Sequence, residues 1–169
     1  MKNNILNENS LAEIRQILSA VCDPEIPVLT IADLGILREV KIVDETVEIT
    51  ITPTYSGCPA MDMINMNIRL ALIKHGYKHI EIKSILSPAW TTDWMTESGK
   101  EKLKAYGIAP PGKTLTRSEP GLFASAEAMQ CPLCNSWHTK LVSQFGSTTC
   151  KALYQCEDCR EPFDYFKCH

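Results

Sequence analysis

The sequence predicts an α+β fold: a small α-β-β-α-β domain with an extra C-terminal helix, followed by a β-ribbon. Two kinds of periodicity support this fold, because apolar residues recur at helical spacing in some segments and alternate with polar residues in others. A third observation is a pair of C-x-x-C motifs near the C-terminus. We expect domains over residues 1–107 and 128–169, joined by a Pro- and Gly-rich linker over 108–127.

Composition and charge narrow the classes of function. The 169 residues are 44% hydrophobic and 22% charged, which is enough to bury a core. A net charge of -3 supplies no basic field, so neither nucleic acid nor a membrane surface is an expected partner. No apolar run approaches the roughly 20 residues of a spanning helix, and no signal-peptide core follows the first residues. We therefore expect a cytoplasmic protein.

The first predicted helix begins at a capping box. Ser10 and Glu13 have the spacing at which the two side chains satisfy each other's backbone N–H groups. We expect the helix to span residues 10–22, because the residue before Pro24 is disfavoured in the helical conformation. Cys22 ends the apolar stripe of this helix and is expected to lie in the core. Residues 26–35 should then form an ordered loop.

The remaining elements of the first domain follow from alternation and from Pro and Gly signals. Residues 36–43 and 46–52 alternate and predict a β-hairpin. Pro59 suits the first position of a second helix, which should end at His75-Gly76. Residues 79–86 predict a third strand, and residues 92–106 predict the extra helix. The methionines of the second helix, Met61, Met63 and Met66, are expected to be packing residues.

Four of the eight cysteines have the spacing of a zinc ribbon. Cys131 and Cys134 are separated by 21 residues from Cys156 and Cys159, and strands are predicted over 137–145 and 148–155. A segment of about 40 residues has too little core to fold alone, so the metal should supply on the order of 10 kcal/mol of folding free energy. Four thiolates leave no open coordination position, so we expect a structural site. Iron on the same four thiolates remains an alternative.

Cys58 stands apart from the ribbon. With Pro59 at the first helical position, its sulfur should lie at the helix N-cap, beside free N–H groups and the positive end of the helix dipole. We expect this position to favour the thiolate that a reactive or metal-binding cysteine needs, with hydroxyls nearby from Thr54 and Ser56. The alternative is a buried cysteine that acts as a small apolar residue.

Several motifs together resemble the iron–sulfur assembly domain family that includes SufT-like proteins. They are Asp23-Pro24-Glu25-Ile26-Pro27, Asp33-Leu34-Gly35 and the run over residues 52–59, TPTYSGCP. Three further segments, 88–95, 105–111 and 163–168, resemble one branch of that family, PaaD (also called PaaJ). Members of this branch are encoded with the phenylacetyl-CoA epoxidase of aerobic phenylacetate degradation. The resemblance covers essentially the whole chain.

This resemblance implies a non-catalytic accessory factor, usually named as an epoxidase subunit, which helps to mature an iron–sulfur or iron-containing component of the oxygenase. It places the family's reactive cysteine on Cys58 and its acidic loop motif on Asp23 and Glu25. It places the ribbon ligands on Cys131, Cys134, Cys156 and Cys159. The chain shows no paired Glu-x-x-His motifs, dinucleotide fingerprint or ferredoxin cysteine run, so we expect the redox machinery on other chains.

Two hypotheses of function follow. In the first, Cys58 transiently ligates iron or a labile iron–sulfur cluster, alone or across a homodimer, for delivery to an epoxidase component or its reductase, while the zinc ribbon docks the client. In the second, the chain is an adaptor that holds oxygenase components together. A thiol hydrolase with His75 or His79 as base is disfavoured, because a helix of about 16 residues, roughly 24 Å long, separates them from Cys58.

Overall fold

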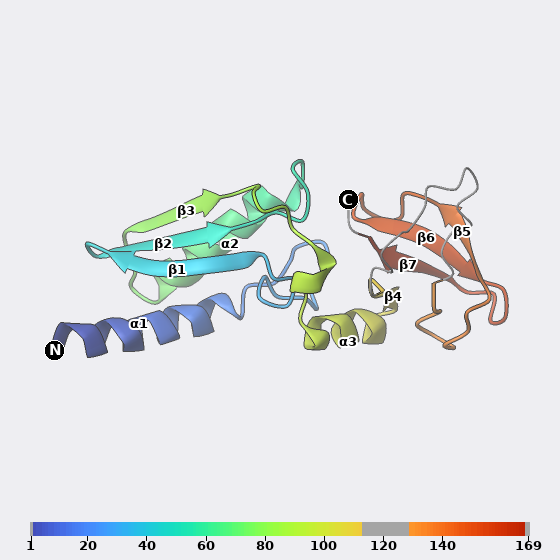
Figure 1. Ribbon diagram of the computed structural model, residues 1–169, viewed down its shortest axis with the longest axis horizontal. Helices are drawn as coiled ribbons and strands as arrows, with labels where there is room; N and C mark the ends of the chain where they lie inside the picture. The colour runs from blue at the N-terminus through green and yellow to red at the C-terminus, as the bar shows by residue number, and fades with distance from the viewer. Residues whose placement is uncertain (1, 113–128, 168–169) are drawn as a thin grey trace. The chain divides into compact units, whose positions relative to one another are not determined.

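The computed structural model describes residues 2–112 and 129–167, and the chain divides into two compact units, residues 1–99 and 100–169. The first unit contains a three-stranded sheet and two long helices, and the second contains a four-stranded sheet (Figure 1). A further helix, α3 (Glu97–Ala105), crosses the limit between the units. This arrangement confirms the predicted α+β fold. No helix within the described ranges has the length and apolar character needed to cross a membrane.

The sheet of the first unit has the strand order β1-β2-β3. Its elements are α1 (Lys2–Leu18), β1 (Leu37–Val43), β2 (Thr46–Ile51), α2 (Ala60–Lys74) and β3 (Ile80–Ser84). Strand β1 pairs antiparallel with β2, and β3 pairs parallel with β2, as a hairpin–helix–strand order requires. Alternate residues of the central strand are fully buried, Val47, Ile49 and Ile51.

Both long helices contribute one face to the core of this unit. Helix α1 contacts β1 and α2, and α2 also contacts β3. Ile14 and Leu18 of α1 are completely buried, as are Ile64, Ile68 and Leu72 of α2. These residues recur at i, i+4 spacing, which places them on one side of each helix.

The start and end of α1 differ from the prediction. The helix begins at Lys2, so Ser10 and Glu13 lie inside it and the predicted capping box is wrong. The residues before Ser10 include neither Pro nor Gly, so nothing stops the helix from extending toward the N-terminus.

The helix ends at Leu18, and Cys22 then forms an extended bridge with Thr30. Because successive side chains of extended backbone point to opposite sides, Cys22 is exposed between two buried neighbours, and its predicted core position is wrong.

The loop before β1 is ordered, as predicted, and the segment after β3 packs against it. The Asp33 carboxylate accepts hydrogen bonds from the backbone N–H of Thr30 (3.0 Å) and from the hydroxyl of Thr96 (3.2 Å). The indole N–H of Trp90 donates to the Leu34 carbonyl oxygen (2.8 Å). Gly35 has φ +67°, and a Cβ at this position would collide with the backbone of Trp94. Residues 92–94 form a 3₁₀ turn here, so the last helix begins at Glu97, later than predicted.

The sheet of the second unit has the order β4-β7-β6-β5. Its strands are β4 (Ile108–Ala109), β5 (Thr139–Ser143), β6 (Lys151–Cys156) and β7 (Pro162–Phe166), and only the β4–β7 pair is parallel. The rings of Tyr154 and Phe163 stack in its small core at 5.9 Å between centroids. Strands β5 and β6 were predicted, whereas β4 and β7 were not. The predicted linker lies outside the described residues from position 113 onward, so the predicted domain limits stay a prediction.

Candidate functional site

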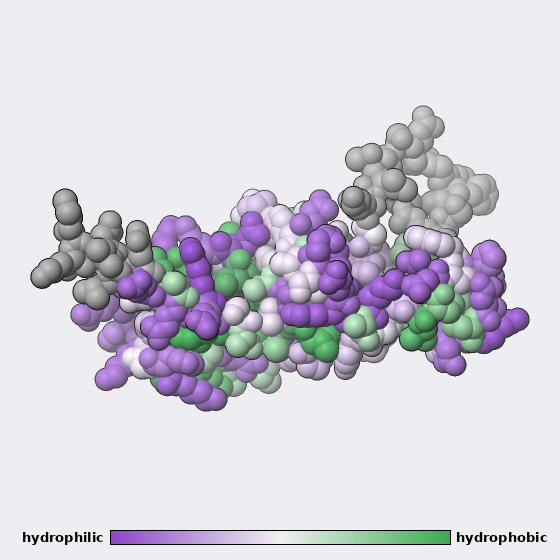
Figure 2. All heavy atoms as spheres, turned by 90° about the horizontal axis from the view of Figure 1, so that it is seen from below, coloured by the Kyte–Doolittle hydropathy of each residue, from purple (hydrophilic) through white to green (hydrophobic). Residues whose placement is uncertain are grey.

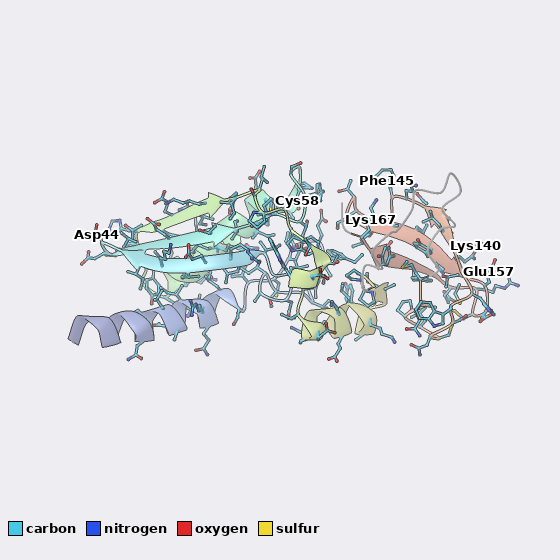
Figure 3. The ribbon with its side chains drawn as sticks, in the orientation of Figure 1. Asp44, Cys58, Lys140, Phe145, Glu157 and Lys167 are labelled. Atoms are coloured by element: carbon cyan, nitrogen blue, oxygen red, sulfur yellow. The ribbon has the colours of Figure 1, made fainter. Side chains whose placement is uncertain are left out.

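Cys58 lies in the loop between β2 and α2, one residue before the N-cap of the helix (Figure 3). Helix α2 begins at Ala60 with Pro59 as its N-cap, one residue later than predicted. The backbone N–H of Ala60 donates a hydrogen bond to the Cys58 sulfur, and the hydroxyl of Thr54 also hydrogen-bonds to it. The thiol is half-buried, so it is neither fully enclosed in the core nor freely exposed.

The pKa of the Cys58 thiol is raised above its ordinary value, mainly because burial removes solvent from the ionised form. The N–H of Ala60 and the hydroxyl of Thr54 favour the thiolate, as the helix-start geometry predicted, but their effect is smaller. The negative charges of Asp23 and Glu25 raise the pKa further. The predicted thiolate is therefore wrong for the metal-free protein, in which Cys58 is a neutral thiol.

The fold brings the predicted acidic loop to Cys58, because the charges of Asp23 and Glu25 both act on its sulfur. Asp23 is buried, and its Oδ1 accepts hydrogen bonds from the backbone N–H groups of Glu25 and Ile26, both at 2.8 Å. These bonds fix the turn that holds the two carboxylates. Ser56 is exposed in the Cys58 loop, and its predicted supporting role stays a prediction.

The charges of Asp23 and Glu25 give the surroundings of the Cys58 thiol a negative field, which disfavours an anion there. The negative field that opposes ionisation of Cys58 would attract a metal ion, and a bound ion would in turn lower the thiol pKa. Sulfur and carboxylate oxygen together are donors that suit first-row transition metals. With a single cysteine, the ligand set is incomplete.

The four ribbon cysteines meet in space as their spacing predicts. The sulfur atoms of Cys131, Cys134, Cys156 and Cys159 all lie within 4.8 Å of one another. The Cys131–Cys159 sulfurs are 3.8 Å apart and the Cys134–Cys156 sulfurs 3.5 Å. Sulfurs at about 2.3 Å from a tetrahedral ion are about 3.8 Å from one another, so the donor set and its spacing fit a four-thiolate metal site.

The two cysteine knuckles repeat the same backbone structure. In each, the N–H of the first cysteine donates to the carbonyl five residues later, from Cys131 to Ser136 (2.8 Å) and from Cys156 to Glu161 (3.0 Å). The residue after the second cysteine has positive φ, 63° at Asn135 and 69° at Arg160. These turns aim both sulfurs of a knuckle toward one point.

Glutamines that precede the knuckles support them, a role that we did not predict from the sequence. The side-chain N–H of Gln130 donates to the Asn135 carbonyl (3.1 Å), and that of Gln155 donates to the Arg160 carbonyl (3.2 Å). Each glutamine therefore closes the turn of its own knuckle. The signal was present in the sequence as a repeated Q-C-x-x-C.

Asp158 joins the two knuckles. Its carboxylate accepts a hydrogen bond from the Ser136 hydroxyl and lies 3.3 Å from Nδ1 of His138. These two partners hold the pKa of Asp158 below its usual range. Because Ser136 and His138 follow the first knuckle and Asp158 belongs to the second, the contact brings the two cysteine pairs together. Spacing alone gave no signal for this contact.

Without a metal, the two thiols of the second knuckle, Cys156 and Cys159, differ in acidity. The N–H of Cys159 lowers the pKa of Cys156 to about 7. The N–H of Glu161 favours the Cys159 thiolate, but desolvation and the neighbouring cysteines raise the Cys159 pKa to about 12. A metal ion that binds all four thiolates must displace the remaining protons, so loading of this site depends on pH.

Comparison with known proteins gives two family matches in different parts of the chain. Residues 11–78 match the family described as "Iron-sulfur cluster assembly protein", and residues 116–167 match the "PaaD zinc beta ribbon domain". Cys58, Asp23 and Glu25 lie in the first match, and the four ribbon cysteines lie in the second.

Two relatives and one solved structure give more detail. The chain is 51% identical to one subunit of the "Putative 1,2-phenylacetyl-CoA epoxidase" of Escherichia coli (strain K12), over 92% of each chain. It is 36% identical to the "Fe-S protein maturation auxiliary factor" of Porphyromonas gingivalis, over 54% of this chain and 88% of that protein. The crystal structure of a DUF59 domain from Bacillus anthracis, 26% identical, aligns with a TM-score of 0.55 over 59% of this chain and 96% of that one.

Proposed function

Because this chain belongs to the PaaD family, we propose that it is an accessory maturation factor of a multicomponent phenylacetyl-CoA epoxidase, without catalytic activity of its own. In this proposal it helps to deliver iron or an iron–sulfur cluster to another component of the complex or to its reductase. The observation that carries the proposal is that the charges of Asp23 and Glu25 both act on the half-buried thiol of Cys58. We place this activity in the cytoplasm, where thiols stay reduced.

The proposed role of Cys58 is transient ligation of the cargo. An incoming iron cation is attracted by Asp23 and Glu25, the thiol proton passes to solvent, and the sulfur binds the ion. The Ala60 N–H and the Thr54 hydroxyl already hydrogen-bond to this sulfur and would stabilise its negative charge. Because one cysteine cannot complete the coordination of iron or of a cluster, the cargo stays exchangeable.

The proposed role of the ribbon metal is structural. Zinc on Cys131, Cys134, Cys156 and Cys159 would supply folding free energy to a unit with a small core, and four thiolates would leave no position for a substrate. The chain's own contribution is to hold the knuckles in place through Gln130, Gln155 and Asp158. A ribbon stabilised in this way can dock a client.

The experiment that tests this function is maturation of the epoxidase in cells that lack the protein and are supplied with variants of it. We expect Cys58→Ala to leave the purified complex deficient in iron, acid-labile sulfide and epoxidase activity. Cys22→Ala is the matched control, because Cys22 is an exposed cysteine of the same unit whose thiol lies 3.7 Å from the Ala20 carbonyl oxygen. Full metal content with Cys58→Ala would contradict the proposal.

An adaptor function is the second candidate, and exposed apolar side chains of the ribbon favour it. Leu133, Trp137 and Phe145 are large apolar residues that lie at the surface, and Figure 2 shows hydrophobic side chains among hydrophilic ones on the face of this unit that it draws. Such side chains are typical anchors of protein interfaces. If the other subunits contain full iron and sulfide in cells without this protein but assemble poorly, the adaptor is the better account.

A further inference from the structure

The outer face of α2 exposes a stripe of apolar side chains that the fold does not use. Met63 is 48% exposed, Met66 55%, Leu70 48% and Ile73 56%. They lie on the side of the helix opposite the buried Ile68. The expectation that Met63 and Met66 pack in the core is therefore wrong. These two methionines belong to a second, exposed face of the helix.

The spacing of this stripe is that of a helix–helix seam. Its residues, 63, 66, 70 and 73, are separated by three, four and three positions, which is the a/d pattern of two heptads. An apolar stripe restricted to a and d positions is narrower than the face that a helix buries in a globular core. Such a seam is suited to one further helix rather than to a sheet or a flat surface.

We propose that the partner helix is α2 of a second copy of this chain, packed antiparallel. The stripe is symmetric about position 68, so an antiparallel two-fold places Met63 opposite Ile73 and Met66 opposite Leu70 of the other copy. A self-complementary pattern of this kind is what a two-fold interface between identical chains requires.

Charge favours the antiparallel arrangement over the parallel one. Asp62 lies in the first turn of α2 and Lys74 in the last. Antiparallel packing brings the Asp62 end of one helix level with the Lys74 end of the other, and it opposes the two helix dipoles. Parallel packing would bring like charges and like dipole ends together.

The proposed dimer has two consequences. Four half-exposed side chains form a patch well below the roughly 800 Å² per partner of a standard interface, so association should be weak and concentration-dependent. The 15 residues of α2 span about 22 Å, and antiparallel packing puts the two Cys58 residues at opposite ends of the seam. Each Cys58 then acts within its own copy, and ligation shared across the homodimer is not expected.

The test is sedimentation velocity of the full, zinc-loaded chain over about a hundredfold range of concentration, because a weak dimer responds to mass action. We expect the mass to rise from 18.9 kDa toward twice that value. Leu70→Asp should keep the chain monomeric over the whole range. Val43→Asp is the control, since Val43 is similarly exposed, at 45%, on β1. Circular dichroism verifies that each variant is folded. If Leu70→Asp is unfolded, Leu70→Gln is used in its place.

Charge exchange tests the orientation. Asp62→Lys should weaken the dimer severalfold, because it places two basic ends together, and Asp62→Lys with Lys74→Asp should recover most of that loss. A monomer at every concentration would overturn the proposal, as would equal dissociation by Val43→Asp and Leu70→Asp. If the dimer of the double variant dissociates as readily as that of Asp62→Lys alone, the antiparallel packing would be overturned. The dimer does not depend on metal binding by Cys58.

Discussion

The carboxylate of Asp23 raises the pKa of the Cys58 thiol, although one residue follows the first helix and the other precedes the second. Two backbone N–H groups, those of Glu25 and Ile26, donate to Oδ1 of Asp23 at 2.8 Å and fix the position of this carboxylate. Burial is the main cause of the raised pKa of Cys58, and the negative charge of Asp23 adds to it and would also attract a cation. The thiol pKa is therefore raised, and we propose that Cys58 serves as a metal ligand rather than as a nucleophile, a contrast that can be measured.

The first prediction concerns the acidity of Cys58. Glu25→Gln removes one of the charges that raise the thiol pKa, so the pKa should fall and alkylation near pH 8 should become faster. Peptide mass spectrometry can follow iodoacetamide labelling of Cys58 as a function of pH. Glu13→Gln is the control, because the Glu13 carboxylate accepts a hydrogen bond from the Tyr77 hydroxyl, away from the Cys58 loop. A slower reaction in Glu25→Gln would show that the carboxylate acts in the opposite direction.

The second prediction concerns stability at alkaline pH. Because the pKa of Cys58 is raised in the folded state, the unfolded chain releases the thiol proton first as the pH rises. Wild type should therefore lose stability through the ordinary range of a cysteine thiol near pH 9 and above, and Cys58→Ala should lose less over the same range. Urea unfolding at pH 7 and pH 10 makes the comparison, with Cys22→Ala as the reference. An identical loss in wild type and Cys58→Ala would contradict this linkage.

The third prediction concerns the left-handed residue of the second knuckle. Arg160 has φ 69°, a conformation that glycine adopts without the steric cost of a Cβ, and its contact with Gln155 uses only the carbonyl. Arg160→Gly should therefore stabilise the zinc-loaded protein by about 0.5–1 kcal/mol in thermal unfolding. Glu157→Gly in the same knuckle should destabilise it instead, because φ is negative there.

The fourth prediction concerns Gly35 and the Trp94 segment. Gly35 and Gly76 both have positive φ, but a Cβ would collide with the Trp94 backbone only at Gly35, and at Gly76 no atom lies within 4 Å. Gly76→Ala should cost about 1–2 kcal/mol for its backbone conformation alone, and Gly35→Ala should cost clearly more. Chemical denaturation measures the free energy of unfolding of both variants. An equal loss of stability in the two would show that the loop and Trp94 can move apart without an energetic cost.

The fifth prediction concerns metal removal. A strong chelator should unfold the second unit, because its small core depends on the four-cysteine site. The backbone amides of β5, β6 and β7 should then lose their protection from hydrogen exchange. Those of β1, β2 and β3 should keep it, since the first unit has its own core. Protection retained in the ribbon after complete loss of metal would contradict a structural role for the ion.

Local patterns predicted the elements whose own residues determine them. The alternation from Val47 to Ile51 predicted β2, and the buried positions Ile64, Ile68 and Leu72 of α2 follow a single helical face. The meeting of the four ribbon cysteines followed from spacing, because each C-x-x-C turn is local and the separation of the two turns is typical of one four-thiolate site.

Features that depend on contacts between distant segments were missed. The residues next to Cys58 in the sequence do not show that its thiol is half-buried. Burial raises the pKa of this thiol by more than the N–H groups at the helix start lower it, so the direction of the pKa shift was predicted wrongly. The Asp158 contacts join two knuckles whose pairing no local pattern describes. Met63 and Met66 have helical spacing, but periodicity alone did not distinguish a core face from a second, exposed one.

The most direct test of the central claim is anaerobic titration of ferrous ion, followed by Mössbauer spectroscopy, on protein whose ribbon has first been saturated with zinc. Zinc on the four ribbon cysteines leaves Cys58 as the remaining half-buried thiol beside carboxylates in the described chain. We expect iron with sulfur and oxygen ligands in wild type and in Cys22→Ala, and its loss in Cys58→Ala. Iron bound equally well, with the same spectrum, by Cys58→Ala would contradict the account.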